Sequence, residues 1–227
     1  GIYDMSEGLK FLDSVQLPSA PFTITVSPKG TRFAAVYAYE TAIYDMDTRQ
    51  LLVKLPIQKS ALSDVIFINE NKIVYAGSDG VTAYDIEKEQ VLWKGGTATT
   101  LVTSNDGTTL AALNKNADGV TVYRIDDGTR LIERSFEGLH LSVPFNDIYA
   151  DPDNSIFALN ENGTRLAVSF SNGGFYILNL EDADEDLIVY DESEYLRFDG
   201  AFKDRYFAYI ANKSDKSVFG IIDTDEA

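Results

Sequence analysis

Residues Phe22 to Pro56 read FTITVSPKGTRFAAVYAYETAIYDMDTRQLLVKLP. The stretch holds four runs rich in β-branched and aromatic residues, separated by Pro-Lys-Gly, by a Tyr-Glu junction and by Asp-Thr-Arg. Such residues favour strands, and short polar turns connect antiparallel neighbours. The stretch therefore predicts an antiparallel meander of four strands.

The end of the third run recurs along the chain. A β-rich run that closes on Tyr-Asp or a related pair appears as Ile2-Tyr3-Asp4-Met5, Ile43-Tyr44-Asp45-Met46, Ala83-Tyr84-Asp85-Ile86, Val122-Tyr123-Arg124-Ile125, Ile177-Leu178-Asn179-Leu180 and Ile221-Ile222-Asp223-Thr224. The third residues of these runs lie 41, 40, 39, 55 and 44 positions apart. A period of about 40 residues that contains four strands is typical of a propeller blade.

A second mark precedes these runs, a polar turn with glycine that leads into a strand of small residues. It appears at Ser27 to Ala34, Asn105 to Ala111 and Asn160 to Ala167. Glycine supplies the positive φ that a tight hairpin requires. With the Tyr-Asp runs, these units resemble the degenerate WD40-like or YVTN-type repeats of bacterial β-propellers.

The resemblance implies an all-β fold, a β-propeller of about five four-stranded antiparallel blades in one domain, 1–227. The blades are expected at 21–56, 62–95, 98–137, 155–192 and 196–225. The last holds only three strands, and Leu9 to Pro18 aligns with Gln50 to Pro56, so it is a possible closing strand. However, Ile2 to Met5 resembles a third strand, which gives one strand too many. A closed ring and an arc of a larger propeller therefore both remain open.

Composition excludes several classes of protein. The chain is 44% hydrophobic, which excludes disorder, and its net charge of −17 opposes binding to nucleic acid or to anionic membranes. It contains no cysteine, so thiol catalysis, disulfides and thiolate metal sites are absent. No apolar run approaches the roughly 20 residues that span a bilayer, so we expect no membrane insertion within this segment.

The longest spacing places an insertion at Gly138 to Asn154, GLHLSVPFNDIYADPDN. Extra residues between strands lie at strand ends, where binding surfaces form. The insertion contains His140, the only histidine, together with the aromatic residues Phe145 and Tyr149. We therefore predict these three residues as ligand-binding or partner-binding residues.

Three aspartates, Asp182, Asp184 and Asp186, have the alternate spacing of a calcium loop. That loop also needs glycine at its sixth position and glutamate at its twelfth, and the chain has Leu187 and Ser193 there. A solvated acidic turn between the third and fourth strands of a blade is therefore favoured over calcium, and no other metal site is predicted.

The sequence contains no complete motif for catalysis or for cofactor binding. Ser142 and Asp147 follow His140, but no G-x-S-x-G elbow accompanies them, so we predict no catalytic residues. The segment from Ala83 to Gly95 resembles a repeat of pyrroloquinoline-quinone enzymes. That family repeats its tryptophan, whereas Trp93 is the only one here. We therefore expect no cofactor, and we expect Trp93 to be a packing residue on an outer strand.

These observations favour a non-catalytic binding or interaction module that docks a protein or peptide. Its expected mark is an exposed apolar patch rimmed by polar groups. The module would belong to a larger bacterial surface or membrane-associated protein, in an extracytoplasmic rather than a cytoplasmic setting. The alternative is a hydrolase or lyase with a carboxylate site at the central channel, which needs acidic residues converging from different blades.

Overall fold

The computed structural model describes residues 2–4, 10–37, 40–55, 62–77, 79–114, 116–139, 156–169, 174–190, 197–212 and 216–225. Over these ranges the chain is all-β, with sheets of four, four, four, four and three antiparallel strands and a two-stranded hairpin before them. The helical segment among them is a single 3-10 turn, η2 (Ala183–Glu185). No helix within these ranges has the length and apolar character needed to cross a membrane.

The sheets follow one another in chain order, one for each repeat. The first sheet contains β3 (Thr23–Val26), β4 (Arg32–Val36), β5 (Thr41–Asp45) and β6 (Leu51–Lys54). The second contains β7 (Leu62–Phe67), β8 (Lys72–Gly77), β9 (Gly80–Asp85) and β10 (Gln90–Lys94). The meander predicted for Phe22 to Pro56 is therefore confirmed.

The remaining sheets repeat this order. The third contains β11 (Ala98–Thr103), β12 (Thr109–Asn114), β13 (Gly119–Arg124) and β14 (Arg130–Ser135). The fourth contains β15 (Ile156–Leu159), β16 (Arg165–Ser169), β17 (Phe175–Asn179) and β18 (Leu187–Tyr190). The fifth contains β19 (Arg197–Lys203), β20 (Tyr206–Asn212) and β21 (Ser217–Asp223), and the hairpin is β1 (Ile2–Asp4) and β2 (Lys10–Asp13).

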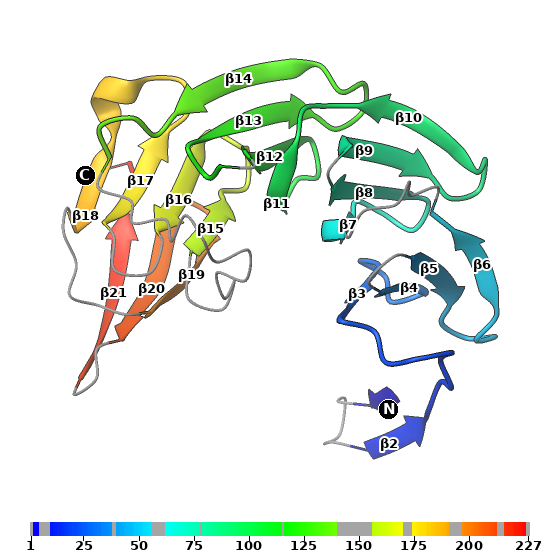
Figure 1. The fold of residues 1–227 in the computed structure, drawn as a ribbon. Coiled ribbons are helices and arrows are strands. Elements are labelled where there is room, and N and C mark those ends of the chain that lie inside the picture. Colours follow the sequence, from blue (N-terminus) through cyan, green and yellow to red (C-terminus); the bar gives the residue numbers. More distant parts are fainter. Residues whose placement is uncertain are drawn as a thin grey trace.

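The sheets are arranged side by side around an open arc (Figure 1). The fourth strands β6, β10 and β14 lie along the convex side, and the first strands lie along the concave side. Successive first strands are in contact, from β3 to β7, β11, β15 and β19. Each sheet therefore has two faces. The face on the side of the preceding part of the chain is here called the leading face, and the opposite face is called the trailing face.

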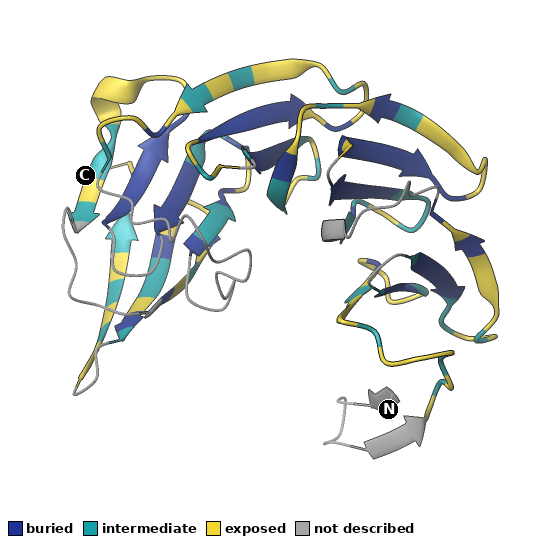
Figure 2. Cartoon of the chain, in the orientation of Figure 1, coloured by how far each residue is buried: buried dark blue, intermediate teal, exposed yellow. Residues whose placement is uncertain are grey.

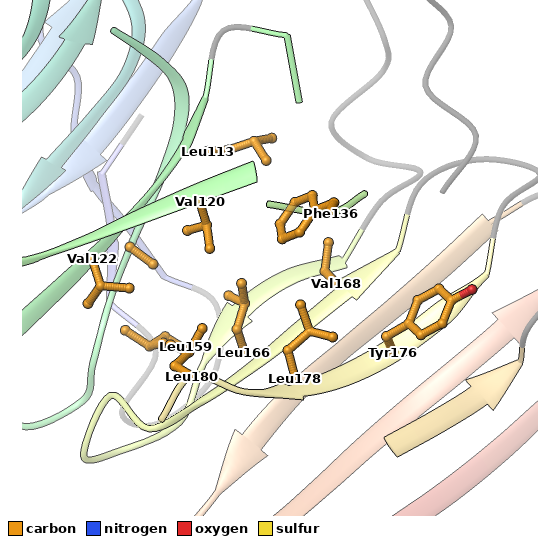
Figure 3. Packing of buried hydrophobic residues seen from close by; sticks show 11 residues of the cluster. Leu113, Val120, Val122, Phe136, Leu159, Leu166, Val168, Tyr176, Leu178 and Leu180 are labelled. Carbon is orange, nitrogen blue, oxygen red and sulfur yellow. The ribbon is translucent and has the colours of Figure 1, made fainter. Parts of the chain in front are cut away.

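The core lies between the sheets, where the trailing face of one packs on the leading face of the next. Figure 3 shows such a layer, here called a junction, between the third and fourth sheets. Leu113, Val120 and Val122 approach it from the third sheet, and Leu166 and Leu178 from the fourth. Because the middle strands of the first four sheets are covered on both faces, they are buried along almost their whole length (Figure 2).

Hydrogen-bonded turns connect the third strands to the fourth. The Asp45 carboxylate accepts the backbone N–H of Thr48 at 2.7 Å, and the Asp85 carboxylate accepts that of Lys88 at 2.9 Å. These bonds hold the pKa of both carboxyls below the usual range. In the fourth sheet the side chain of Asn179 accepts the N–H of Glu181 in the same way. The recurring residue is therefore a turn former, as Asp and Asn often are.

The possible closing strand, Leu9 to Pro18, does not pair with the fifth sheet among the described residues. Within Leu9 to Pro18, β2 pairs with β1, and β21 pairs with β20 alone, so no closed ring forms among the described residues. The hairpin lies at the other end of the arc from β21 (Figure 1). The physical reason is local packing: Val15 and Leu17 pack against the leading face of the first sheet.

Candidate functional site, an uncovered sheet face

Among the strands that the structure describes, none lies against the trailing face of the fifth sheet. Ala208 and Ile210 on β20 lie opposite Ile221 and Phe219 on β21, so the four side chains share this face. Ile210, Phe219 and Ile221 are 43%, 67% and 62% exposed. We call this surface, with Asp199 of β19 opposite Ile210, the terminal face.

The same four positions are buried in every other sheet. Their register equivalents are Ala34, Val36, Thr41 and Ile43 in the first sheet, Val74, Ala76, Val81 and Ala83 in the second, Ala111, Leu113, Val120 and Val122 in the third, and Ala167, Ser169, Phe175 and Ile177 in the fourth. None of these residues is more than 5% exposed. The terminal face therefore has the composition of a junction face that lacks its partner.

Polar groups rim this apolar surface. Lys203 ends β19, and Arg205 pairs with Asp223 at 2.9 Å. The Arg205 guanidinium also lies over the ring of Tyr206, 5.2 Å from its centroid. A contiguous apolar patch inside a polar rim is the usual mark of a protein-interaction surface. Burial of one large apolar side chain is worth about 1.5–3 kcal/mol, so three such side chains give a partner a substantial gain.

A partly buried carboxylate bridges the second junction, the one between the second and third sheets. Asp64 on β7 accepts the backbone N–H of Leu101 on β11 at 2.8 Å, and also the N–H of Val65 at 2.8 Å. Burial raises the pKa of the Asp64 carboxyl above its usual value, although both N–H groups oppose the shift. Asp64 lies opposite Ala76 on β8, and Asp199 lies opposite Ile210, the register equivalent of Ala76. Asp199 thus holds the position of Asp64 on a face that is exposed.

The pH dependence of stability tests the state of Asp64. The folded chain holds this proton to a higher pH than the unfolded chain does, so the contribution of Asp64 to stability falls as pH rises through its raised pKa. Asparagine carries no charge and still accepts the Leu101 N–H through its one amide oxygen, but the Val65 N–H loses the acceptor that the second carboxylate oxygen provides. We expect the stability of Asp64→Asn relative to wild type to be highest at pH 7 and to decrease as pH falls toward the usual aspartate pKa. Urea unfolding at a series of pH values measures the difference.

The matched control for this experiment is Asp45→Asn, because the pKa of Asp45 is lowered rather than raised. A lowered pKa gives stability at neutral pH that is lost as pH falls through it. This control should therefore be less stable than wild type at pH 7, with a loss that also shrinks in acid. A difference in stability between Asp64→Asn and wild type that is independent of pH would show that burial of the Asp64 charge does not contribute to it.

The predicted binding residues His140, Phe145 and Tyr149 lie outside the described residues. Of the insertion, the structure describes Gly138 and Leu139. The backbone N–H of Leu139 donates to the Phe136 carbonyl at 3.0 Å, and its side chain packs against the third junction. The beginning of the insertion, at Leu139, is therefore anchored to the core next to β14.

Two of the three candidate calcium ligands, Asp182 and Asp186, make other contacts through their carboxylates. Asp182 caps η2 by accepting the N–H of Asp184 at 3.0 Å. Asp186 accepts the N–H of Asn179 at 2.9 Å and forms an ion pair with Arg134 of β14. Over the ranges that the structure describes, no three His, Cys, Asp or Glu side chains form a group that could hold a metal ion. The carboxylates instead fix the turn and link the third sheet to the fourth.

A channel-type catalytic site would draw carboxylates from several first strands. Among the described first strands, acidic residues occur in β7 and β19, as Asp64 and Asp199. Asp64 is committed to backbone N–H groups, and Asp199 lies on the terminal face, three sheets further along the arc. These two carboxylates therefore do not make a shared site.

The terminal face was not predicted from the sequence. The alternation of Ile210 with Ala208 and of Phe219 with Ile221 repeats the pattern of buried middle strands. Two features of the sequence together could have indicated this face: the alternation of apolar residues and a last repeat of only three strands. A final sheet without a neighbour exposes apolar side chains at positions that are buried in the other sheets.

Comparison with known proteins supports the fold and nothing finer. No protein-family model and no curated protein sequence matches this chain. Among solved structures, hydrazine synthase of Kuenenia stuttgartiensis is similar, with a TM-score of 0.61 and 13% identity over 88% of this chain. This chain spans 59% of that one. Since 1174 solved chains match, the likeness assigns an antiparallel multi-sheet fold and no activity.

Proposed function

We propose that this chain is an arc of a β-propeller that acts as a non-catalytic interaction module. Four-stranded meanders arranged radially, with first strands toward a common centre, are the features that support the propeller. The repeats are of the WD40-like or YVTN type. Because the described part of the chain keeps its sheets rigidly packed, it presents the terminal face as a fixed surface.

One observation carries this proposal: the terminal face is apolar at positions that every other sheet buries. Catalysis does not require such a surface, whereas binding does, because a partner gains free energy by covering it. The partner class is a protein or peptide. A net charge of −17 disfavours nucleic acid and anionic lipid surfaces as partners.

The setting is a larger bacterial surface or membrane-associated protein. The chain spans 59% of the similar hydrazine synthase chain. An extracytoplasmic position fits a chain that contains no cysteine. The terminal face is then the surface through which this segment meets the rest of an assembly.

Site-specific photocross-linking tests the proposal. Phe219→p-benzoylphenylalanine places the probe on the terminal face, and Ile188→p-benzoylphenylalanine is the matched control, because Ile188 is 63% exposed on β18, away from that face. We expect irradiation of producing cells to give a discrete protein adduct from position 219 and none from position 188. Adducts of equal yield from both positions, or none from position 219, would reject the terminal face as an interaction surface.

A further inference from the structure

We propose that Asn162 is a site of spontaneous deamidation, at which the folded turn between β15 and β16 promotes conversion of the side-chain amide to a carboxyl without an enzyme. The co-reactant is water. The site lies in the fourth sheet and involves no residue of the terminal face, so the proposal is independent of the proposed function.

The turns between the first and second strands of three sheets share one sequence pattern, a polar residue followed by Gly-Thr. The polar residue is Lys29 in the first sheet, Asp106 in the third and Asn162 in the fourth. In each turn the glycine has a positive φ, of 72°, 69° and 74°, and its N–H donates to the carbonyl three residues earlier. The three turns therefore have the same backbone geometry, and among them only Asn162 presents an amide beside the glycine nitrogen.

An asparagine followed by glycine forms a cyclic imide readily, because glycine has no side chain to hinder its nitrogen. The Gly163 nitrogen attacks Cγ of Asn162. The new N–Cγ bond forms, the Cγ–Nδ2 bond breaks, and the amide leaves as ammonia with the proton of the Gly163 nitrogen. Water then opens the imide at either carbonyl. One opening gives aspartate, and the other gives isoaspartate, in which the backbone runs through the former side chain.

The contacts of the Asn162 side chain favour this attack. Its Oδ1 accepts the hydroxyl of Thr164 at 2.8 Å and the backbone N–H of Thr164 at 3.3 Å. Because attack at Cγ places negative charge on Oδ1, the same two donors stabilise the tetrahedral intermediate. The Gly163 N–H donates to the Asn160 carbonyl at 3.2 Å, a longer bond than the 2.8 and 2.9 Å of the other two turns. Asn162 is exposed, so water and hydroxide reach it.

The third sheet shows that this turn accommodates the aspartate product. There Oδ1 of Asp106 accepts the backbone N–H of Thr108 at 2.9 Å and its hydroxyl at 2.8 Å. These are the contacts that Asn162 makes to Thr164. Deamidation to aspartate therefore adds a negative charge and keeps the turn.

The isoaspartate product should be tolerated less well, because it lengthens the backbone by a methylene group next to Gly163. Gly163 packs so closely on Thr109 of the third sheet that a Cβ at Gly163 would clash with that side chain. The lengthened backbone should therefore loosen the contact between the third and fourth sheets.

Peptide mapping by mass spectrometry, after incubation of the folded protein at neutral and at alkaline pH, tests the proposal. Asn162 should change to the mass of aspartate, faster at alkaline pH, and give both aspartate and isoaspartate. Asn105, an exposed asparagine of the equivalent turn that is not followed by glycine, should keep its amide. Trypsin cleavage after Arg165 separates Asn162 from Asn172, another asparagine followed by glycine, which lies outside the described residues.

A matched pair of variants tests the part played by the turn. Thr164→Val removes the hydroxyl donor and should slow the reaction at Asn162 about fivefold, whereas Thr164→Ser keeps the donor and should match wild type. Circular dichroism and thermal unfolding check that both variants fold. Asn162→Asp should unfold at the same urea concentration as wild type, and an aged sample that contains isoaspartate at this position should unfold at a lower one.

Two results would overturn the proposal. The first is an amide that persists at Asn162 in the folded protein while the urea-unfolded chain loses it, because the fold would then protect the site. The second is an equal rate for Thr164→Val and wild type, because the contacts of the turn would then not promote the reaction.

Discussion

Replacing Trp93 with alanine is expected to lower the free energy of unfolding by about 3–5 kcal/mol, the usual cost of removing a large buried aromatic side chain. Trp93 is buried on β10, where its ring stacks on Tyr123 of the third sheet with 5.6 Å between centroids. Its indole Nε1–H donates to the Ile125 carbonyl at 2.7 Å. Gly128 lies so close to the indole that a Cβ there would meet it at 2.6 Å. The substitution thus removes one of the large side chains that fill the second junction.

Urea unfolding of Trp93→Ala measures this effect. Two further variants separate the contribution of the indole hydrogen bond from that of apolar packing. Trp93→Phe keeps most of the apolar contact but leaves the Ile125 carbonyl without its indole donor, so we expect a loss of about 1–3 kcal/mol. Val91→Ala, at an exposed position of the same strand, should change stability by less than about 0.5 kcal/mol. A loss for Trp93→Ala no greater than that of Val91→Ala would mean that the second junction is not packed as described.

Replacing Phe175 with alanine should cost a similar amount, about 3–5 kcal/mol, and should act on one end of the molecule. Phe175 is fully buried on β17, and its ring meets Phe198, Phe207 and Tyr209 of the fifth sheet at 5.8, 5.6 and 5.2 Å between centroids. The fifth sheet has a neighbour on one face only. Loss of this ring therefore removes a central contact that holds it to the arc.

Hydrogen exchange read by mass spectrometry distinguishes local from global loss. In an array whose units contact only their neighbours, a weakened last junction frees the last unit first. Amides of β19, β20 and β21 should lose protection in Phe175→Ala, while those of the first sheet keep it. The control is Phe22→Ala, at a strongly exposed phenylalanine, which should leave both regions unchanged. Uniform loss of protection along the chain would argue against independent junctions.

Much of the fold could be predicted from the sequence, because a repeat places the same residue types at the same structural positions. The Tyr-Asp runs predicted third strands, and their turn bonds at Asp45 and Asp85 are as expected. Trp93 was expected to pack on an outer strand, and it does so by reaching the next sheet. Each of these features depends on contacts that are local or that repeat from unit to unit.

The sequence left open whether the ring is closed, for a different reason. The alignment of Leu9 to Pro18 with Gln50 to Pro56 shows that this segment resembles the fourth strand of a repeat. Such a resemblance does not determine which sheet the segment pairs with. That choice depends on long-range packing, and here Val15 and Leu17 place the segment beside the first sheet. The same limit hid the terminal face, since the alternation at Ile210 and Phe219 is identical whether or not another sheet covers it.

Charged residues show the limit most plainly. The spacing of Asp182, Asp184 and Asp186 was interpreted within one turn, whereas the ion-pair partner of Asp186 is Arg134, 52 residues away. The burial of Asp64 likewise depends on a strand of the next sheet. The spacing of residues in the sequence shows which charged side chains are close along the chain. The packing of neighbouring sheets determines which of them form contacts.

The central claim is that the fifth sheet presents an uncovered junction face, and thiol accessibility tests it most directly. The chain has no cysteine, so single substitutions report alone. Ile221→Cys lies on the terminal face, and Ile177→Cys occupies the equivalent buried position of the fourth sheet. In dilute protein, the thiol from Ile221→Cys should react with maleimide at nearly the rate of the urea-unfolded chain, while that from Ile177→Cys stays protected. Equal protection of both thiols in the dilute monomer would contradict the account.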